Sequence, residues 1–103
     1  MRTEDGRRYA GANVENAAYP QGQCAEASAI GALIAAGRKH VTEVAVISEG
    51  AAPCVPCGGC RQRLREFIVP GAEIHMAGAS GQKVTATLEQ LLPRSFGPEF
   101  LAG

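Results

Sequence analysis

The sequence predicts an α/β protein with a mixed sheet of about five strands. Short β-branched segments alternate with segments of helical composition, and strands separated by helices favour parallel pairing. The 103 residues are expected to form one domain, residues 1–103. A domain of this size buries only about 60–70% of its unfolded surface, so its core is thin and a metal ion or partner subunits would add stability.

The first half of the chain predicts two strands, a loop and a buried helix. Met1–Thr3 has the character of a strand end, the turn Glu4-Asp5-Gly6 follows, and Arg7–Val14 returns as a second strand. Glu15–Gln23 carries turn residues without a period, which is typical of an ordered loop. Cys24–Ala36 is rich in Ala, Ile and Leu and is followed by glycine, which predicts a helix and its stop.

The second half of the chain completes the alternation. Glu43–Ser48 is a short β-branched strand without a polar face, as expected when both faces are covered. A helix is predicted over about Cys57–Phe67, and Glu73–Ala77 is the next full strand. Lys83–Thr85 pairs back after a turn, and Leu88–Leu92 forms a short helix that a proline ends.

The charge balance argues against nucleic acid and membranes as partners. Ten Lys and Arg residues match ten Asp and Glu residues, so the zero formal net charge leaves no long-range field to attract them. The mostly apolar stretch Ala25–Gly37 is too short to span a bilayer. Met1–Arg8 is charged, so we expect no secretory signal and a cytoplasmic location, where cysteines are metal ligands or catalysts more often than disulfides.

Three of the four cysteines have spacings that suit a metal site. Cys57 and Cys60 are three residues apart at the start of a predicted helix, so both sulfurs face the same way and the helix N–H groups favour thiolates. Cys24 begins the other long helix. If both helix N-termini meet at the carboxyl ends of the strands, three thiolates meet there. They leave a fourth tetrahedral position open, which is the arrangement of a catalytic zinc.

Glu26 follows Cys24 by two residues and adds a group that can move protons. A carboxylate beside a metal, but outside its ligand set, can exchange protons with water. Cys24-Ala25-Glu26 followed by Pro56-Cys57-x-x-Cys60 resembles the zinc nucleoside deaminases. The use of cysteine rather than histidine as first ligand is similar to the small homotetrameric cytidine deaminases.

The resemblance covers nearly the whole chain, in the order and spacing of that family. Gly11–Pro20 (GANVENAAYP) resembles the ribose-binding stretch, and Cys60-Arg61-Gln62 resembles the second metal motif. Leu91-Leu92-Pro93-x-x-Phe96-Gly97-Pro98 resembles the C-terminal signature. The resemblance implies a three-layer α/β/α cytidine deaminase-like fold.

The resemblance also implies the chemistry. Cys24, Cys57 and Cys60 would hold one Zn²⁺ per subunit. Glu26 would take a proton from water and deliver it to N3 of the pyrimidine and then to the departing amine, while hydroxide attacks C4 and ammonia leaves. The implied reaction is the deamination of cytidine, and of deoxycytidine, to uridine or deoxyuridine in pyrimidine salvage.

The substrate-binding residues follow from the same resemblance. Asn13 and Glu15 match the positions that hydrogen-bond the ribose hydroxyls, and Ala25 is assigned to the substrate pocket. The residues expected to act at a neighbouring subunit's site, across an interface, are Ala17, Tyr19 and Phe96. The expected assembly is a homotetramer with active sites shared between subunits.

Charge neutralisation at the metal is a further expectation. Three thiolates and Zn²⁺ sum to one negative charge, so a nearby cation should be needed, and Arg61 is the candidate outside the ligand set. Many members of the family have a second arginine directly after the glutamate, where this chain has Ala27. That difference predicts a more electron-rich zinc.

The start of the chain also departs from the family pattern. Members begin with a helix and then a strand whose aromatic residue helps to wall the pyrimidine pocket. Met1–Thr3 corresponds to the middle of that strand, so the domain is expected to be short at its N-terminus.

Three other functions are left open. Cys54-x-x-Cys57-x-x-Cys60 copies the first three ligands of a bacterial ferredoxin run, which makes an iron–sulfur module an alternative, although the next ligand position is Leu64. A deaminase-like scaffold that binds zinc without turnover is the second alternative. The third is a deaminase of nucleoside analogues such as blasticidin S. Under the deaminase interpretation, Cys54 is expected to be a structural thiol.

Overall fold

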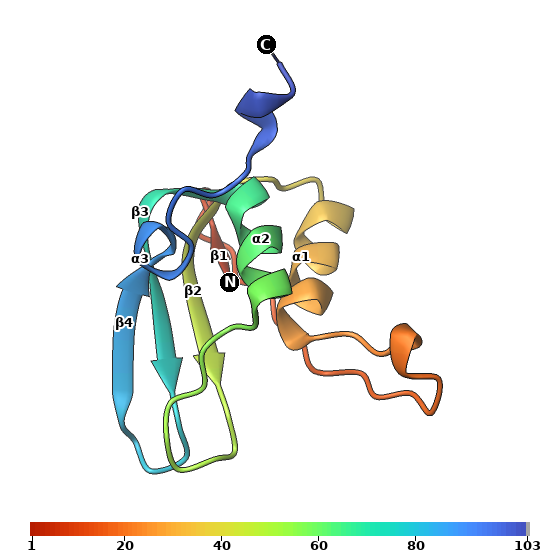
Figure 1. The fold of residues 1–103 in the computed structure, drawn as a ribbon, viewed down its shortest axis with the longest axis vertical. Coiled ribbons are helices and arrows are strands. Elements are labelled where there is room, and N and C mark those ends of the chain that lie inside the picture. Colours follow the sequence, from red (N-terminus) through yellow and green to blue (C-terminus); the bar gives the residue numbers. More distant parts are fainter. Residues whose placement is uncertain (103) are drawn as a thin grey trace.

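A four-stranded sheet with the strand order β1-β2-β3-β4 forms one layer of the molecule (Figure 1). The structure is a computed structural model that describes residues 1–102. Its strands are β1 (Arg2–Thr3), β2 (Val41–Ile47), β3 (Ile68–Ala77) and β4 (Lys83–Thr87). Its helices are α1 (Ala25–Ala35), α2 (Gly58–Phe67) and α3 (Leu88–Leu91), with 3₁₀-helices η1 (Tyr19–Gln21) and η2 (Pro98–Phe100).

The strand pairing confirms the α/β class and the mixed sheet. β2 and β3 are parallel and are joined through α2, while β1 and β4 pair antiparallel on the two sides. The predicted helices over Cys24–Ala36 and about Cys57–Phe67 are confirmed as α1 and α2. The sheet has four strands, close to the five expected.

The missing strand is the one predicted over Arg7–Val14. In this segment the described residues form only isolated bridges, Arg2 with Arg8 and Val14 with Gln23. The segment packs against α1 instead of extending the sheet: a Cβ added at Gly11 would lie 2.3 Å from the Ala25 carbonyl oxygen. The segment therefore packs closely on the backbone of α1 instead of pairing as a strand. This contact is not visible in the alternation of residue types along the sequence.

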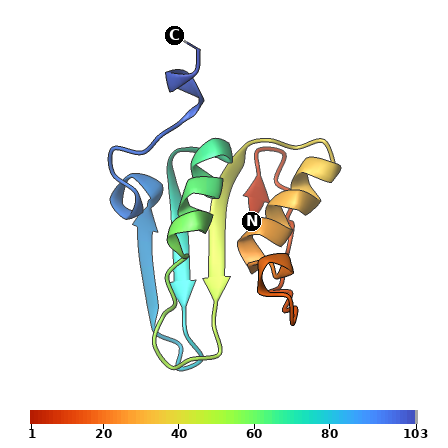
Figure 2. The same cartoon turned by 45° about the vertical axis from the view of Figure 1, so that its right-hand side comes forward.

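Helices α1 and α2 lie against the same face of the sheet (Figures 1 and 2). Between them and the sheet is one apolar core, formed by Ile30, Leu33, Val41, Val44, Leu64, Ile74, Met76 and Leu88. Leu88 places α3 on this face as well. Among residues 1–102, α1, α2 and α3 therefore all contribute side chains to the core on this face of the sheet. None of these helices is long and apolar enough to cross a bilayer.

The opposite face of the sheet carries a row of polar side chains across all four strands. His75 Nε2 lies 2.8 Å from Glu43 Oε2, and His75 Nδ1 lies 3.0 Å from Thr85 Oγ1. The Arg2 guanidinium pairs with Glu43 at 3.1 Å. The hydrogen bond from His75, assisted by Arg2, holds the pKa of Glu43 below its ordinary value. Polar pairs between neighbouring strands therefore stabilise the sheet on this face.

Both long helices begin at the same end of the sheet. Figure 1 shows α1 and α2 starting where the arrowheads of β2 and β3 end. Cys24 is the N-cap of α1 and Cys57 is the N-cap of α2, and neither side chain is used for capping. The carboxyl ends of the parallel strands thus bring two cysteine-bearing helix N-termini together, as the sequence predicted.

We predict that Gly11→Ala destabilises the protein because its Cβ would overlap the α1 backbone at Ala25 and Ala29, at 2.3 and 2.4 Å. Overlap with backbone atoms should cost about 1–3 kcal/mol in the free energy of unfolding. Urea denaturation of the zinc-loaded protein at fixed concentration measures it.

Gly31→Ala is the matched control. Gly31 lies inside α1 with nothing within 4 Å of an added Cβ, so alanine should raise the free energy of unfolding by about 0.5–1 kcal/mol. Equal effects of the two substitutions would show that Gly11 does not pack on the helix as described.

Candidate metal centre

Three cysteine sulfurs converge where α1 and α2 begin. Cys24 and Cys57 are the N-cap residues, and Cys60 lies in the first turn of α2. Their Sγ atoms all lie within 4.8 Å of one another. Cys60 is buried, Cys24 is half-buried and Cys57 is exposed, so the cluster is open to solvent on one side.

The spacing of the sulfurs fits zinc. A tetrahedral Zn²⁺ about 2.3 Å from each sulfur would hold the sulfurs about 3.8 Å apart. The observed cluster reaches that arrangement by small side-chain rotations, since no sulfur is more than 4.8 Å from another. Three protein ligands leave one tetrahedral position for water or substrate.

The electrostatic surroundings of the three thiols differ. Burial first, and then hydrogen bonds with Cys57 and Cys24 and the charge of Glu26, together raise the pKa of the Cys60 thiol to about 12. Hydrogen bonds from Cys60, first from its backbone N–H, lower the pKa of Cys57. Cys57 therefore ionises before Cys60, and a metal must displace the proton of Cys60 to bind.

The cation beside the thiols is Arg63. Its Nη1 lies 3.5 Å from Cys60 Sγ, and this contact lowers the pKa of Cys60. Arg61, the candidate from the sequence, donates instead to two carbonyl oxygens, of Pro56 and Leu91, each at 2.8 Å. Sequence reasoning missed Arg63, although its position three residues after Cys60, on the same helix face, was an available signal.

Glu26 lies in the first turn of α1 and lines a cavity of about 660 Å³ with Cys24 and Cys57, which we call the thiol cavity. Its charge acts on Cys60, which places the carboxylate close to the sulfur cluster. Glu26 also lines a second cavity of about 420 Å³ that extends toward Met1. A half-buried carboxylate between thiols and solvent can accept and return protons at a metal site.

Two of the predicted substrate-binding residues line the thiol cavity. Asn13 and Ala25 are both in its wall. Asn13 Oδ1 accepts a hydrogen bond of 2.8 Å from the Ala25 N–H, which ties the loop to the start of α1. Reciprocal backbone hydrogen bonds of 2.8 Å between Val14 and Gln23 close the base of the loop that follows.

The structure does not bring the remaining predicted residues to this cavity. Glu15, Ala17 and Tyr19 lie in an exposed loop that projects from the body, and Tyr19 is 87% exposed (Figure 1). Phe96 lies in the C-terminal segment and is 54% exposed. Cys54 is exposed and lines the thiol cavity, but it is not one of the three clustered cysteines.

Comparison with known proteins identifies the family. The family model of the cytidine and deoxycytidylate deaminase zinc-binding region matches residues 1–76. A cytidine deaminase of Sporosarcina psychrophila is 34% identical over 99 residues, which cover 96% of this chain and 73% of that protein. The chain belongs to this deaminase family. A cytidine deaminase of Halalkalibacterium halodurans is also 34% identical, over 93% of this chain and 73% of its own length.

Solved structures confirm the cytidine deaminase-like fold. The crystal structure of cytidine deaminase from Burkholderia pseudomallei matches with a TM-score of 0.86 and 36% identity, covering 92% of this chain and 76% of that one. The enzyme from Mycobacterium leprae matches with a TM-score of 0.69 and 39% identity, covering 90% and 74%.

Zinc is therefore the cofactor, and the chain is a deaminase by family. The iron–sulfur alternative is wrong, because it needed Cys54 beside Cys57 and Cys60, whereas Cys24 takes that place in the cluster. The position of its next ligand, Leu64, is fully buried in the apolar core.

We predict that Cys24→Ser, Cys57→Ser and Cys60→Ser each lose zinc. Serine replaces a thiolate by a hydroxyl that stays protonated near neutral pH, so the metal content should fall from about one zinc per chain to well below one. Atomic absorption on protein purified without added metal measures it.

Cys54→Ser is the matched control, since Cys54 lines the same cavity outside the sulfur cluster. This variant should retain zinc. Loss of metal from Cys54→Ser, with retention by Cys24→Ser, would contradict the assigned cluster.

Proposed function

We propose that the chain catalyses the zinc-dependent hydrolysis of cytidine, and of deoxycytidine, to uridine or deoxyuridine and ammonia. The supporting observation is the position of Glu26 beside the three clustered thiols, in the wall of a cavity large enough for a nucleoside. The names of the related proteins supply the substrate class. The same reaction would serve pyrimidine salvage in the cytoplasm.

In this reaction, the cysteines would bind the metal and Glu26 would transfer protons. Cys24, Cys57 and Cys60 hold the zinc, which as a Lewis acid lowers the pKa of water in the site. The Glu26 carboxylate accepts a proton from that water and delivers it to N3 of the pyrimidine. The water oxygen would bond to C4, and Glu26 would pass the second proton of that oxygen to the amino nitrogen as the C4–N bond breaks. C4 would then keep the oxygen as a carbonyl, and ammonia would leave.

Residues at the start of α1 would orient the nucleoside. Asn13 and Ala25 line the thiol cavity, and their hydrogen bond fixes the loop against the helix. Asn13 is suited to hydrogen-bond a ribose hydroxyl. Glu15 is proposed for the ribose from the family resemblance alone, since it lies in the exposed loop outside the cavity. A nucleoside would then be preferred over the free base because the base alone leaves these polar groups without partners.

Arg61 would act through the backbone rather than through its charge. Its Nε donates to the Pro56 carbonyl oxygen at 2.8 Å, directly before the metal ligand Cys57. This hydrogen bond holds the loop in the conformation that points the Cys57 sulfur at the cluster. Supporting contacts of this kind orient metal ligands in many sites.

A homotetramer is part of the proposal. The loop that carries Ala17 and Tyr19 and the segment that carries Phe96 both project from the body of the chain (Figure 1), and none of these three residues lines the thiol cavity. Exposed aromatic side chains on projecting segments are typical of interfaces. In the assembly these residues would complete a neighbour's nucleoside site.

We predict that Glu26→Gln abolishes turnover while zinc is retained. The amide has nearly the same size as the carboxylate but cannot accept a proton, so cytidine deamination should fall by at least about 10²–10⁴-fold. The loss of absorbance on conversion to uridine measures activity, and metal analysis of the same sample measures zinc.

Glu66→Gln is the control, since Glu66 is exposed on α2 and makes the same change in charge. Equal activity of Glu26→Gln and the unmodified protein would contradict the role of Glu26. A zinc-loaded, folded protein that is inert toward cytidine would favour the scaffold alternative, and turnover of blasticidin S alone would favour the analogue deaminase.

A further inference from the structure

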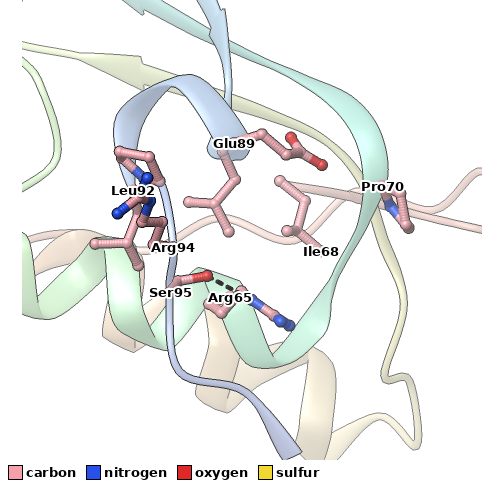
Figure 3. Close-up of a pocket in the computed structure, with 9 residues that line it drawn as sticks. Arg65, Ile68, Pro70, Glu89, Leu92, Arg94 and Ser95 are labelled. Atoms are coloured by element: carbon pink, nitrogen blue, oxygen red, sulfur yellow. Dashed lines mark hydrogen bonds between the residues drawn. The ribbon is translucent and has the colours of Figure 1, made fainter. Parts of the chain in front are cut away.

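Arg65, near the end of α2, makes two polar contacts with the C-terminal segment. Its Nε donates to Ser95 Oγ at 2.7 Å, a hydrogen bond that Figure 3 shows, and its Nη2 pairs with the Glu99 carboxylate. The Arg65 side chain is only 27% exposed. A guanidinium with two fixed partners in this setting is more ordered than a surface ion pair.

Gly97 leaves the space in which this guanidinium lies. A Cβ at position 97 would be 2.5 Å from Arg65 Nη2 and 2.5 Å from Glu99 Oε2. The φ of Gly97 is −147°, an extended conformation that any residue adopts. A side chain at this position would therefore have to displace the ends of Arg65 and Glu99, whereas the backbone conformation itself does not need glycine.

Gln62 holds the same segment one turn earlier on α2. Its Nε2 donates to the Phe96 carbonyl oxygen at 3.0 Å. Gln62 and Arg65 are three residues apart and so share a helix face. Together they hold the backbone and side chains on both sides of Phe96, and we call the contacts of Gln62 and Arg65 with residues 95–99 the α2 clamp.

Core packing alone does not set the direction of this segment. A cavity of about 440 Å³ lies under its base, lined by Arg65, Ser95 and the apolar side chains of Ile68 and Leu92 (Figure 3). Because this cavity leaves the base of the segment without close packing, the polar contacts of the α2 clamp fix the direction of the segment.

The clamped segment ends in an exposed aromatic pair. The rings of Phe96 and Phe100 stack with centroids 5.5 Å apart, and the two residues are 54% and 64% exposed. The segment stands away from the body in both views (Figures 1 and 2). Stacked aromatic rings at such a position suit a second copy of the chain, because aromatic anchors dominate protein interfaces.

We propose that Arg65 is a positioning residue for nucleoside binding: it sets the direction of residues 95–101 and so places the Phe96–Phe100 pair at the site of a neighbouring copy. This inference rests on the proposed function. The same helix begins with Cys57 and Cys60, so α2 orients both the chain's own metal centre and the aromatic pair offered to its neighbour.

The test measures cytidine binding in the Glu26→Gln background, which is expected to keep zinc without turnover. Calorimetry gives the Kd of cytidine for this protein and for the same protein with Arg65→Gln, Glu99→Gln or both. Loss of an ordered aromatic contact should raise Kd about three- to tenfold in each single variant. The Kd of the double variant should be no higher than that of the weaker-binding single variant, because both single substitutions break the same ion pair.

Gly97→Ala tests the clamp by a second route, since its Cβ displaces the guanidinium while Arg65 and Glu99 remain. It should raise Kd to a similar extent. Glu66→Gln, next to Arg65 on the exposed side of α2, should leave Kd unchanged. Hydrogen exchange of residues 95–101 should be faster in the clamp variants and unchanged in Glu66→Gln.

Two results would overturn the proposal: faster exchange with an unchanged Kd, which would make the contact merely structural, or unchanged exchange in the clamp variants. Absence of any cytidine binding by the zinc-loaded Glu26→Gln protein itself would overturn the proposed function instead. In that case hydrogen exchange alone decides whether Arg65 directs the segment.

Discussion

The structure depends on the meeting of two helix N-termini at the carboxyl ends of β2 and β3. This meeting brings three sulfurs within 4.8 Å of one another from two separate parts of the chain. A shared zinc joins α1 to α2, and in a small domain with a thin core such a link adds stability as well as chemistry. The helix N–H groups and Arg63 offset the negative charge that three thiolates concentrate there.

Helix α2 connects the sulfur cluster to the core and to the C-terminal segment. It begins at the metal ligands, contributes Leu64 to the core and holds the C-terminal segment through side chains on one face. The two projecting segments carry the aromatic residues that the chain's own cavity does not use. A single chain therefore contains the clustered thiols with Glu26 beside them, while the proposed assembly would supply the rest of each nucleoside site.

Most elements were predictable because they follow from local patterns. The apolar composition of α1, the cysteines at both helix starts and the β-branched strands are visible in the sequence, and the alternation of strands and helices indicated that the thiols meet. The prediction of a strand over Arg7–Val14 was wrong because Gly11 packs on α1, a tertiary contact that local sequence patterns do not show. Arg63 was missed in favour of Arg61 because Arg61 directly follows the ligand Cys60, although the three-residue spacing from Cys60 to Arg63 indicates a shared helix face.

Zinc-edge X-ray absorption of the metal-loaded protein tests the central claim most directly, because it counts the ligands. We expect three sulfur ligands at about 2.3 Å and one oxygen or nitrogen ligand at about 2.0 Å, at the position left open for water and substrate. Four sulfur ligands, with Cys54 completing the set, would contradict it, since a closed site has no position left for chemistry.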